Sequence, residues 1–81
     1  MQIKVCVFAH LRERCGFSER RYELPEHAKL ADVLTLLFPE PAEWQRLAPS
    51  LMLAVNRQYT SAEHVLLPGD EVAIIPPVAG G

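Results

Sequence analysis

The sequence predicts an α+β fold in which one amphipathic helix packs on one face of a mixed β-sheet. Three observations support this prediction. Short runs of alternating apolar and polar residues, typical of strands, occur in both halves of the chain. A single helical stripe of apolar residues lies between them, and turns rich in proline and glycine separate the segments. With 81 residues, of which 49% are hydrophobic and 22% charged, the chain is expected to form one globular domain over residues 1–81.

The first predicted strand spans residues 2–9. Its alternate side chains are expected to face the core; these are Ile3, Val5, Val7 and Ala9. The same alternation places Phe8 on the opposite face of the sheet. This position matters because a large aromatic side chain there would be left outside the core.

A short connection leads to the second predicted strand. Residues 10–17 are expected to form a turn or a single helical turn that ends at Gly16. Residues 18–24 resume the strand pattern, and Pro25 stops it. Because the gap is short, the two strands are predicted to pair as an antiparallel hairpin.

The main helix is predicted over residues 30–38. Its apolar residues recur at helical spacing and are Leu30, Val33, Leu34, Leu37 and Phe38. Asp32 suits the first turn, although no capping serine, threonine or aspartate precedes Leu30. Pro39 ends the helix. A second short helix is expected over residues 41–47, with Trp44 packing back on the core.

The second half of the chain contains three further predicted strands. Residues 51–56 and 58–60 are expected to pair across a tight turn at Asn56 and Arg57. Residues 71–75 form the last strand, which alternates Val72 and Ile74 inward and Ile75 outward, after a turn at Pro68, Gly69 and Asp70. This order of strands and helices predicts the β-grasp (ubiquitin-like) architecture, with the helix lying across one sheet face.

The composition excludes several classes of function. The net charge is −2 and the basic residues are scattered, so no nucleic-acid-binding stripe is present. The N-terminus lacks the pattern of a signal peptide and the apolar runs are too short to span a membrane, which predicts a cytoplasmic protein. Cys6 and Cys15 do not form a CxxC motif and are interpreted as reduced thiols that behave as small apolar residues.

No catalytic or metal-binding motif is found. The three histidines lack metal-ligand spacing, so a metal site is not expected. The adjacent carboxylates Asp70 and Glu71 are interpreted structurally: Asp70 is expected to shape the turn, and Glu71 to point to water.

The C-terminal six residues form the most informative segment. They are Pro76, Pro77, Val78, Ala79, Gly80 and Gly81. The two prolines cannot extend a strand ladder and favour an extended chain. The following side chains decrease in size to Gly80 and Gly81, and such a slender tail is suited to entering a narrow channel of a partner. Residues 76–81 are therefore predicted to be an extended functional tail.

Several motifs resemble one family, the small subunit of molybdopterin synthase. The resembling residues are Phe8-Ala9, Leu11-Arg12-Glu13 and Gly16, then Leu53-Ala54-Val55-Asn56, Gly69-Asp70-Glu71-Val72-Ala73 and the tail Pro76-Pro77-Val78-Ala79-Gly80-Gly81. The resemblance covers the whole chain, except that residues 39–50 carry no matching motif.

This resemblance implies a sulfur carrier of molybdenum cofactor biosynthesis. The resemblance implies that an E1-like activating enzyme adenylates the carboxylate of Gly81 with ATP, and that a sulfur donor enzyme converts the adenylate to a thiocarboxylate. The tail is then expected to insert into the large synthase subunit, in a heterotetramer, and to donate sulfur to cyclic pyranopterin monophosphate to form the dithiolene. The carrier itself is expected to bind no cofactor, because the catalytic groups would lie on the large subunit.

A docking surface for these partners is predicted on the uncovered face of the sheet. The strand alternation places Phe8 and Ile75 there, and Tyr59 on the short strand is expected to join them. Arg12, in the connection after the first strand, is a plausible polar contact at the rim.

The sequence leaves three other functions open. A sulfur carrier for thiazole synthesis shares the fold and the Gly-Gly end, and a ubiquitin-like modifier would attach Gly81 to lysines of other proteins. A plain interaction domain would tolerate deletion of Gly81. The product formed at Gly81 distinguishes these alternatives.

Overall fold

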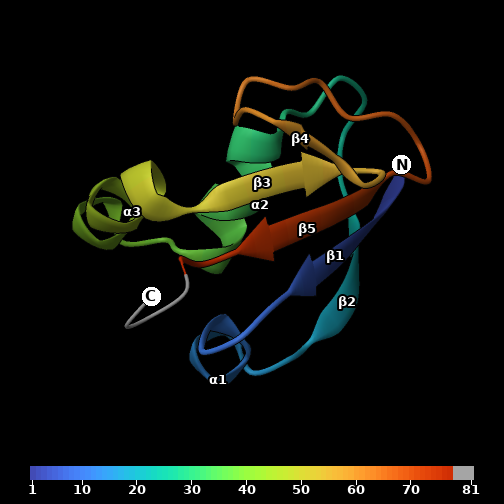
Figure 1. Ribbon diagram of the computed structural model, residues 1–81. Coiled ribbons are helices and arrows are strands. Elements are labelled where there is room, and N and C mark those ends of the chain that lie inside the picture. The colour runs from blue at the N-terminus through green and yellow to red at the C-terminus, as the bar shows by residue number, and fades with distance from the viewer. Residues whose placement is uncertain (78–81) are drawn as a thin grey trace.

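The computed structural model describes residues 1–77 and contains a five-stranded sheet in the order β2-β1-β5-β3-β4 (Figure 1). The strands are β1 (Gln2–Val7), β2 (Glu19–Glu23), β3 (Met52–Val55), β4 (Gln58–Thr60) and β5 (Glu71–Ile75). The central strands β1 and β5 run parallel, whereas the other neighbouring pairs are antiparallel. The predicted mixed sheet and the predicted antiparallel hairpin are therefore confirmed.

The helical segments lie on one face and at one end of this sheet. They are α1 (Leu11–Cys15), α2 (Leu30–Leu37), α3 (Pro41–Leu47) and the 3-10 turn η1 (Ala48–Ser50). In Figure 1, α2 lies behind the sheet, while α1 and α3 flank the end at which β1 and β5 finish. No helix among the described residues has the length and apolar character required to cross a bilayer.

The core lies between α2 and the sheet. The stripe predicted for the helix is buried, and it faces the inward residues of the two central strands. The inward strand residues are Ile3, Val5, Val7, Val72 and Ile74. Trp44 of α3 is partly buried against this core, as predicted. Burial of these aliphatic side chains is the principal stabilising contribution that the structure shows.

One inward residue was assigned wrongly. Ala9 was predicted to face the core, but β1 ends at Val7 and Ala9 is exposed with φ +53°. The left-handed backbone at Ala9 turns the chain into α1, which interrupts the alternation of the strand. The predicted end of this helical turn is confirmed: Gly16, at φ +83°, donates its N–H to the carbonyl of Arg12 at 2.9 Å.

The start of α2 is fixed by a residue inside the helix. The backbone N–H of Lys29 donates to the Asp32 carboxylate at 2.8 Å, and the Asp32 N–H donates to the Lys29 carbonyl at 2.9 Å. The Asp32 side chain thus satisfies the backbone at the N-cap from the third helical position. This explains how the helix begins without a capping side chain before Leu30.

The turn before β5 is organised by a buried carboxylate. Asp70 accepts hydrogen bonds from the Leu67 N–H and from the Asn56 side-chain amide, both at 2.8 Å. Asn56 in turn accepts from the Glu71 N–H at 3.0 Å. The structural interpretation of Asp70 is confirmed. Glu71 was expected to point to water; its side chain is 39% exposed on the sheet face and forms an ion pair with Lys4 at 3.3 Å.

An ion pair joins the two helices at the end of the sheet. The Arg14 guanidinium of α1 holds the Glu43 carboxylate of α3, with Nε–H donating to Oε2 at 2.8 Å. Its central carbon also lies 5.6 Å from the centre of the Phe38 ring. Arg14 lowers the pKa of Glu43 by hydrogen bonding, so the pair stays charged at neutral pH. The contact fixes α1 relative to α3 beside the end of β5.

Candidate functional site

The sheet face that α2 leaves uncovered carries an apolar surface over β5, β3 and β4. The strand register places Ala54 beside both Ala73 and Tyr59, and Met52 beside Ile75. Phe8 follows the end of β1, which is parallel to β5. Phe8 is 44% exposed and Tyr59 is 71% exposed, so these aromatic side chains are accessible to a partner.

A shallow groove of about 310 Å³ is formed on this surface, and we call it the docking groove. Its lining residues are Phe8, Ala54, Arg57, Tyr59, Glu71, Ala73 and Ile75. The two alanines provide space between the larger aromatic and aliphatic side chains. Three residues predicted for the docking surface, namely Phe8, Tyr59 and Ile75, thus line one groove although they come from three different parts of the fold.

The fourth predicted docking residue lies elsewhere. Arg12 is exposed on α1 and does not line the docking groove. Its Nε–H lies 3.5 Å from the carbonyl of Ala9, which closes the turn before α1. Its predicted contact at the rim of a partner surface stays a prediction.

The chain leaves the sheet at the same end as Phe8. β5 ends at Ile75, Pro76 is buried and Pro77 is exposed. Because neither proline carries a backbone N–H, the strand ladder cannot continue through them. Figure 1 shows that α1 and α3 flank this exit. The predictions for Val78, Ala79, Gly80 and Gly81 concern residues outside the described part of the chain.

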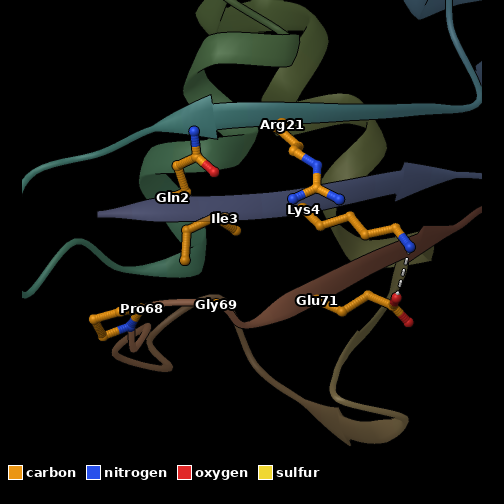
Figure 2. Close-up of a pocket in the computed structure, with 7 residues that line it drawn as sticks. All are labelled: Gln2, Ile3, Lys4, Arg21, Pro68, Gly69 and Glu71. Atoms are coloured by element: carbon orange, nitrogen blue, oxygen red, sulfur yellow. Dashed lines mark ion pairs between the residues drawn. The ribbon is translucent and has the colours of Figure 1, made fainter.

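A second groove, of about 340 Å³, lies on the β1–β2 side and is called here the polar groove (Figure 2). It is lined by Gln2, Ile3, Lys4, Arg21, Pro68, Gly69 and Glu71. The Lys4 ammonium lies 3.3 Å from the carboxylates of both Glu71 and Glu19. The hydrogen bond to Glu71 is the first cause of the raised pKa of Lys4. The charge of Lys4 is therefore compensated by these two carboxylates, so this lysine adds little positive potential for binding a ligand.

The two cysteine thiols are not activated as nucleophiles. Cys6 and Cys15 are both free and half-buried. Burial is the first cause of a raised pKa for each thiol. A raised pKa lowers the thiolate fraction at neutral pH, which is unfavourable for nucleophilic or redox chemistry. Within residues 1–77, no three histidine, cysteine, aspartate or glutamate side chains come together as a potential metal site.

Sequence reasoning missed the small and the basic residues of the docking groove. Ala54 and Ala73 carry a signal, because each has the outward parity of its strand. Arg57 was assigned only to the turn between β3 and β4, and nothing in the strand pattern indicates that it lines a groove.

The chain is similar to known sulfur carriers throughout its length. Residues 5–81 match the ThiS family. The molybdopterin synthase sulfur carrier subunit of Chlamydomonas reinhardtii is 37% identical over 83 residues, which cover 100% of both chains. The subunit of the same name from Arabidopsis thaliana is 36% identical and is matched over 84% of its length and 100% of this chain.

The fold is also similar to the solved structure of a protein that is named as a modifier and not as a sulfur carrier. Small archaeal modifier protein 1 of Haloferax volcanii has a TM-score of 0.83 at 26% identity, and the match covers 100% of both chains. The ubiquitin-like β-grasp assignment is therefore confirmed. The match over residues 5–81, with relatives above 30% identity across the whole chain, shows that this protein belongs to the ThiS family and, within it, to the molybdopterin synthase sulfur carrier subunits.

Proposed function

We propose that this chain carries sulfur as a thiocarboxylate on Gly81 and donates it to cyclic pyranopterin monophosphate during formation of molybdopterin in the cytoplasm. The observation that supports this most directly is the position of the docking groove. Phe8 and Ile75 line the groove, and Ile75 is followed at once by Pro76 and the tail. A partner bound in the groove would therefore lie close to the exit of the tail.

The chemistry requires activation of the Gly81 carboxylate. A free carboxylate is a poor acyl donor, so an E1-like enzyme uses ATP to form the acyl adenylate. The terminal sulfur of a persulfide on the sulfur donor enzyme then attacks the carbonyl carbon, and AMP leaves. A thiol next attacks the donor's own sulfur and breaks the S–S bond, which leaves the thiocarboxylate on Gly81 and a disulfide on the donor side. This sulfur is anionic at neutral pH and can attack the pterin precursor. The carrier provides a tethered reactant, while its partners supply the catalytic groups.

The proposed partners use the carrier in turn. The activating enzyme must receive the tail before sulfur is loaded, and the large synthase subunit must receive it afterwards. Both steps place Gly81 in a partner's active site, so one docking surface beside the tail is sufficient for both. We propose that the synthase assembles as a heterotetramer of two carriers and two large subunits.

The test of the proposal is intact-mass spectrometry of the carrier. The chain is incubated with ATP, its cognate activating enzyme and a sulfur source, and the expected mass gain equals the difference between sulfur and oxygen. Two variants locate the reaction: deletion of Gly81, and addition of one serine after Gly81. Both should retain the fold and the melting temperature, because the tail contributes little to folding. Neither should gain sulfur, because the carboxylate of Gly81 is absent or blocked. Normal loading of the extended variant would contradict the assignment of Gly81.

The similarity to a small archaeal modifier supports a second candidate function. A ubiquitin-like modifier would use the same adenylate but pass the Gly81 acyl group to a lysine amine. The product distinguishes the two functions. Isopeptide-linked conjugates of the carrier in its own cell extract would indicate the modifier, whereas an unconjugated thiocarboxylate that restores molybdopterin synthesis would indicate the sulfur carrier.

A further inference from the structure

The turn between β3 and β4 has an unusual residue at its second position. Asn56 and Arg57 both have positive φ, +51° and +69°. A two-residue hairpin turn of this kind favours glycine at the second position, because the left-handed backbone is strained for a side chain with a Cβ atom. The turn geometry therefore gives no reason for an arginine at position 57.

The surroundings of Arg57 suggest what its side chain does. Arg57 is exposed and lines the docking groove together with Tyr59 and Ile75. Ion pairs within residues 1–77 involve Lys4, Arg14, Lys29 and the N-terminal amine, and none involves Arg57. The one carboxylate that shares the groove, that of Glu71, is engaged by Lys4 at 3.3 Å. Within residues 1–77, the Arg57 guanidinium therefore has no ion-pair partner, and it lines a largely apolar groove.

We infer that Arg57 determines specificity for a docking partner by binding a carboxylate of that partner. An apolar side chain of the partner, next to this carboxylate, covers Ala54 and Ala73. This inference rests on the proposed docking of the large synthase subunit. A guanidinium binds a carboxylate through two parallel hydrogen bonds, which fixes orientation as well as position. Arginine and tyrosine are also the side chains that most often dominate the binding energy of protein interfaces.

Calorimetric titration of the carrier with its cognate large subunit tests the inference. Arg57→Gln should weaken binding about tenfold or more, the usual size for loss of a dominant interface residue. Arg57→Glu should weaken it further, because two carboxylates would then face each other. The matched control is Arg21→Gln, which removes an arginine from the polar groove of the same sheet face and should leave the affinity unchanged.

The outcomes separate this inference from the proposed function. If the parent chain does not bind the large subunit, the docking proposal fails and the role of Arg57 fails with it. If the parent binds and Arg57→Gln or Arg57→Glu binds equally tightly, only the role of Arg57 is overturned. Loss of affinity in the Arg57 variants, with Arg21→Gln unaffected, supports it.

A glycine variant excludes a purely structural role. Arg57→Gly relieves the strained backbone, so its melting temperature should equal or exceed that of the parent while its affinity falls as in Arg57→Gln. A fall in stability together with affinity would show that Arg57 holds the turn, and would overturn the inference. A rise in ionic strength should also weaken the parent more than Arg57→Gln, because the charged contact is screened.

Discussion

The two faces of the sheet are built by the same alternation of side chains but differ in what covers them. On the α2 side, Val5, Val72 and Leu34 are fully buried and hold the fold together. On the other side, Phe8 and Tyr59 remain exposed. Apolar side chains thus stabilise the fold on one face, whereas on the other they are available to a partner. The comparison indicates that stability and binding can be altered separately in this protein.

The uncovered face carries two grooves, the polar groove and the docking groove, which differ in their lining residues. The polar groove contains Lys4, whose charge is compensated by Glu19 and Glu71. The docking groove shares Glu71 but has an apolar lining and an arginine, Arg57, that has no ion pair within residues 1–77. Arg21 of the polar groove also has no ion pair within residues 1–77, so the difference between the two grooves is the apolar lining that surrounds Arg57.

The largest effect on stability is expected from the covered face. Leu34→Ala should lower the free energy of unfolding by about 2–5 kcal/mol, because it removes a fully buried side chain at the centre of the α2 stripe. Small domains hold only about 5–15 kcal/mol in total. Leu36→Ala is the control on the same helix, since Leu36 is 52% exposed. Equal urea denaturation midpoints for the two variants would contradict the assignment of the buried face.

The bounds of several helices and strands could be predicted for a physical reason. The bounds predicted for α3, β4 and β5 are those of the structure, because each segment is delimited by turn residues or prolines. The errors occur where a backbone feature interrupts a pattern, as the left-handed Ala9 does after β1. Strand order depends on contacts between distant residues, and the local pattern does not specify it.

The next largest effect is expected in docking. Ile75→Lys and Phe8→Ser, made separately, should weaken binding to the large subunit and to the activating enzyme by about tenfold or more, since each places a polar group in the apolar groove. Circular dichroism should show that both retain the fold. Leu67→Ser is the control, because Leu67 is exposed but lies outside both grooves. If both variants bind both partners as tightly as the parent, the docking surface lies elsewhere.

The docking groove was only partly predictable. Alternation along β1 and β5 predicts that Phe8 and Ile75 point outward, and both residues line the docking groove. The position of Arg57 could not be predicted in this way. Arg57 lies in a turn with a left-handed backbone, which the alternation of a strand does not describe, and this turn brings it to the groove. Such a residue is found only when the turn and the neighbouring strands are seen together.

A smaller effect concerns the reactivity of the two thiols. Burial raises the pKa of both Cys6 and Cys15, so each is chiefly a protonated thiol at neutral pH. Alkylation by iodoacetamide should therefore be slow near pH 7 and should accelerate as the pH rises through and above the ordinary thiol range. Peptide mass spectrometry after timed quenching resolves the two sites. Rapid alkylation of either cysteine at pH 7 would show an activated thiolate and would reopen a redox role.

The smallest expected effect tests the boundary between the two grooves. Lys4→Gln should change the melting temperature little, because ion pairs at the surface contribute little to stability. It also releases the Glu71 carboxylate, which lines the docking groove together with Arg57. The released carboxylate can then compete with the partner for that guanidinium. We therefore expect the affinity for the large subunit to fall about two- to fivefold, the range implied by exposed ion pairs.

The double variant Lys4→Gln/Glu71→Gln provides the control for this competition. It removes the carboxylate as well as the lysine, so the affinity should return to that of the parent although two side chains have been changed. In the Arg57→Gln background, Lys4→Gln should have no effect on affinity, because the group for which Glu71 competes is absent. An equal loss of affinity in both backgrounds would show that Lys4 contacts the partner directly, and the polar groove would then have to be included in the docking surface.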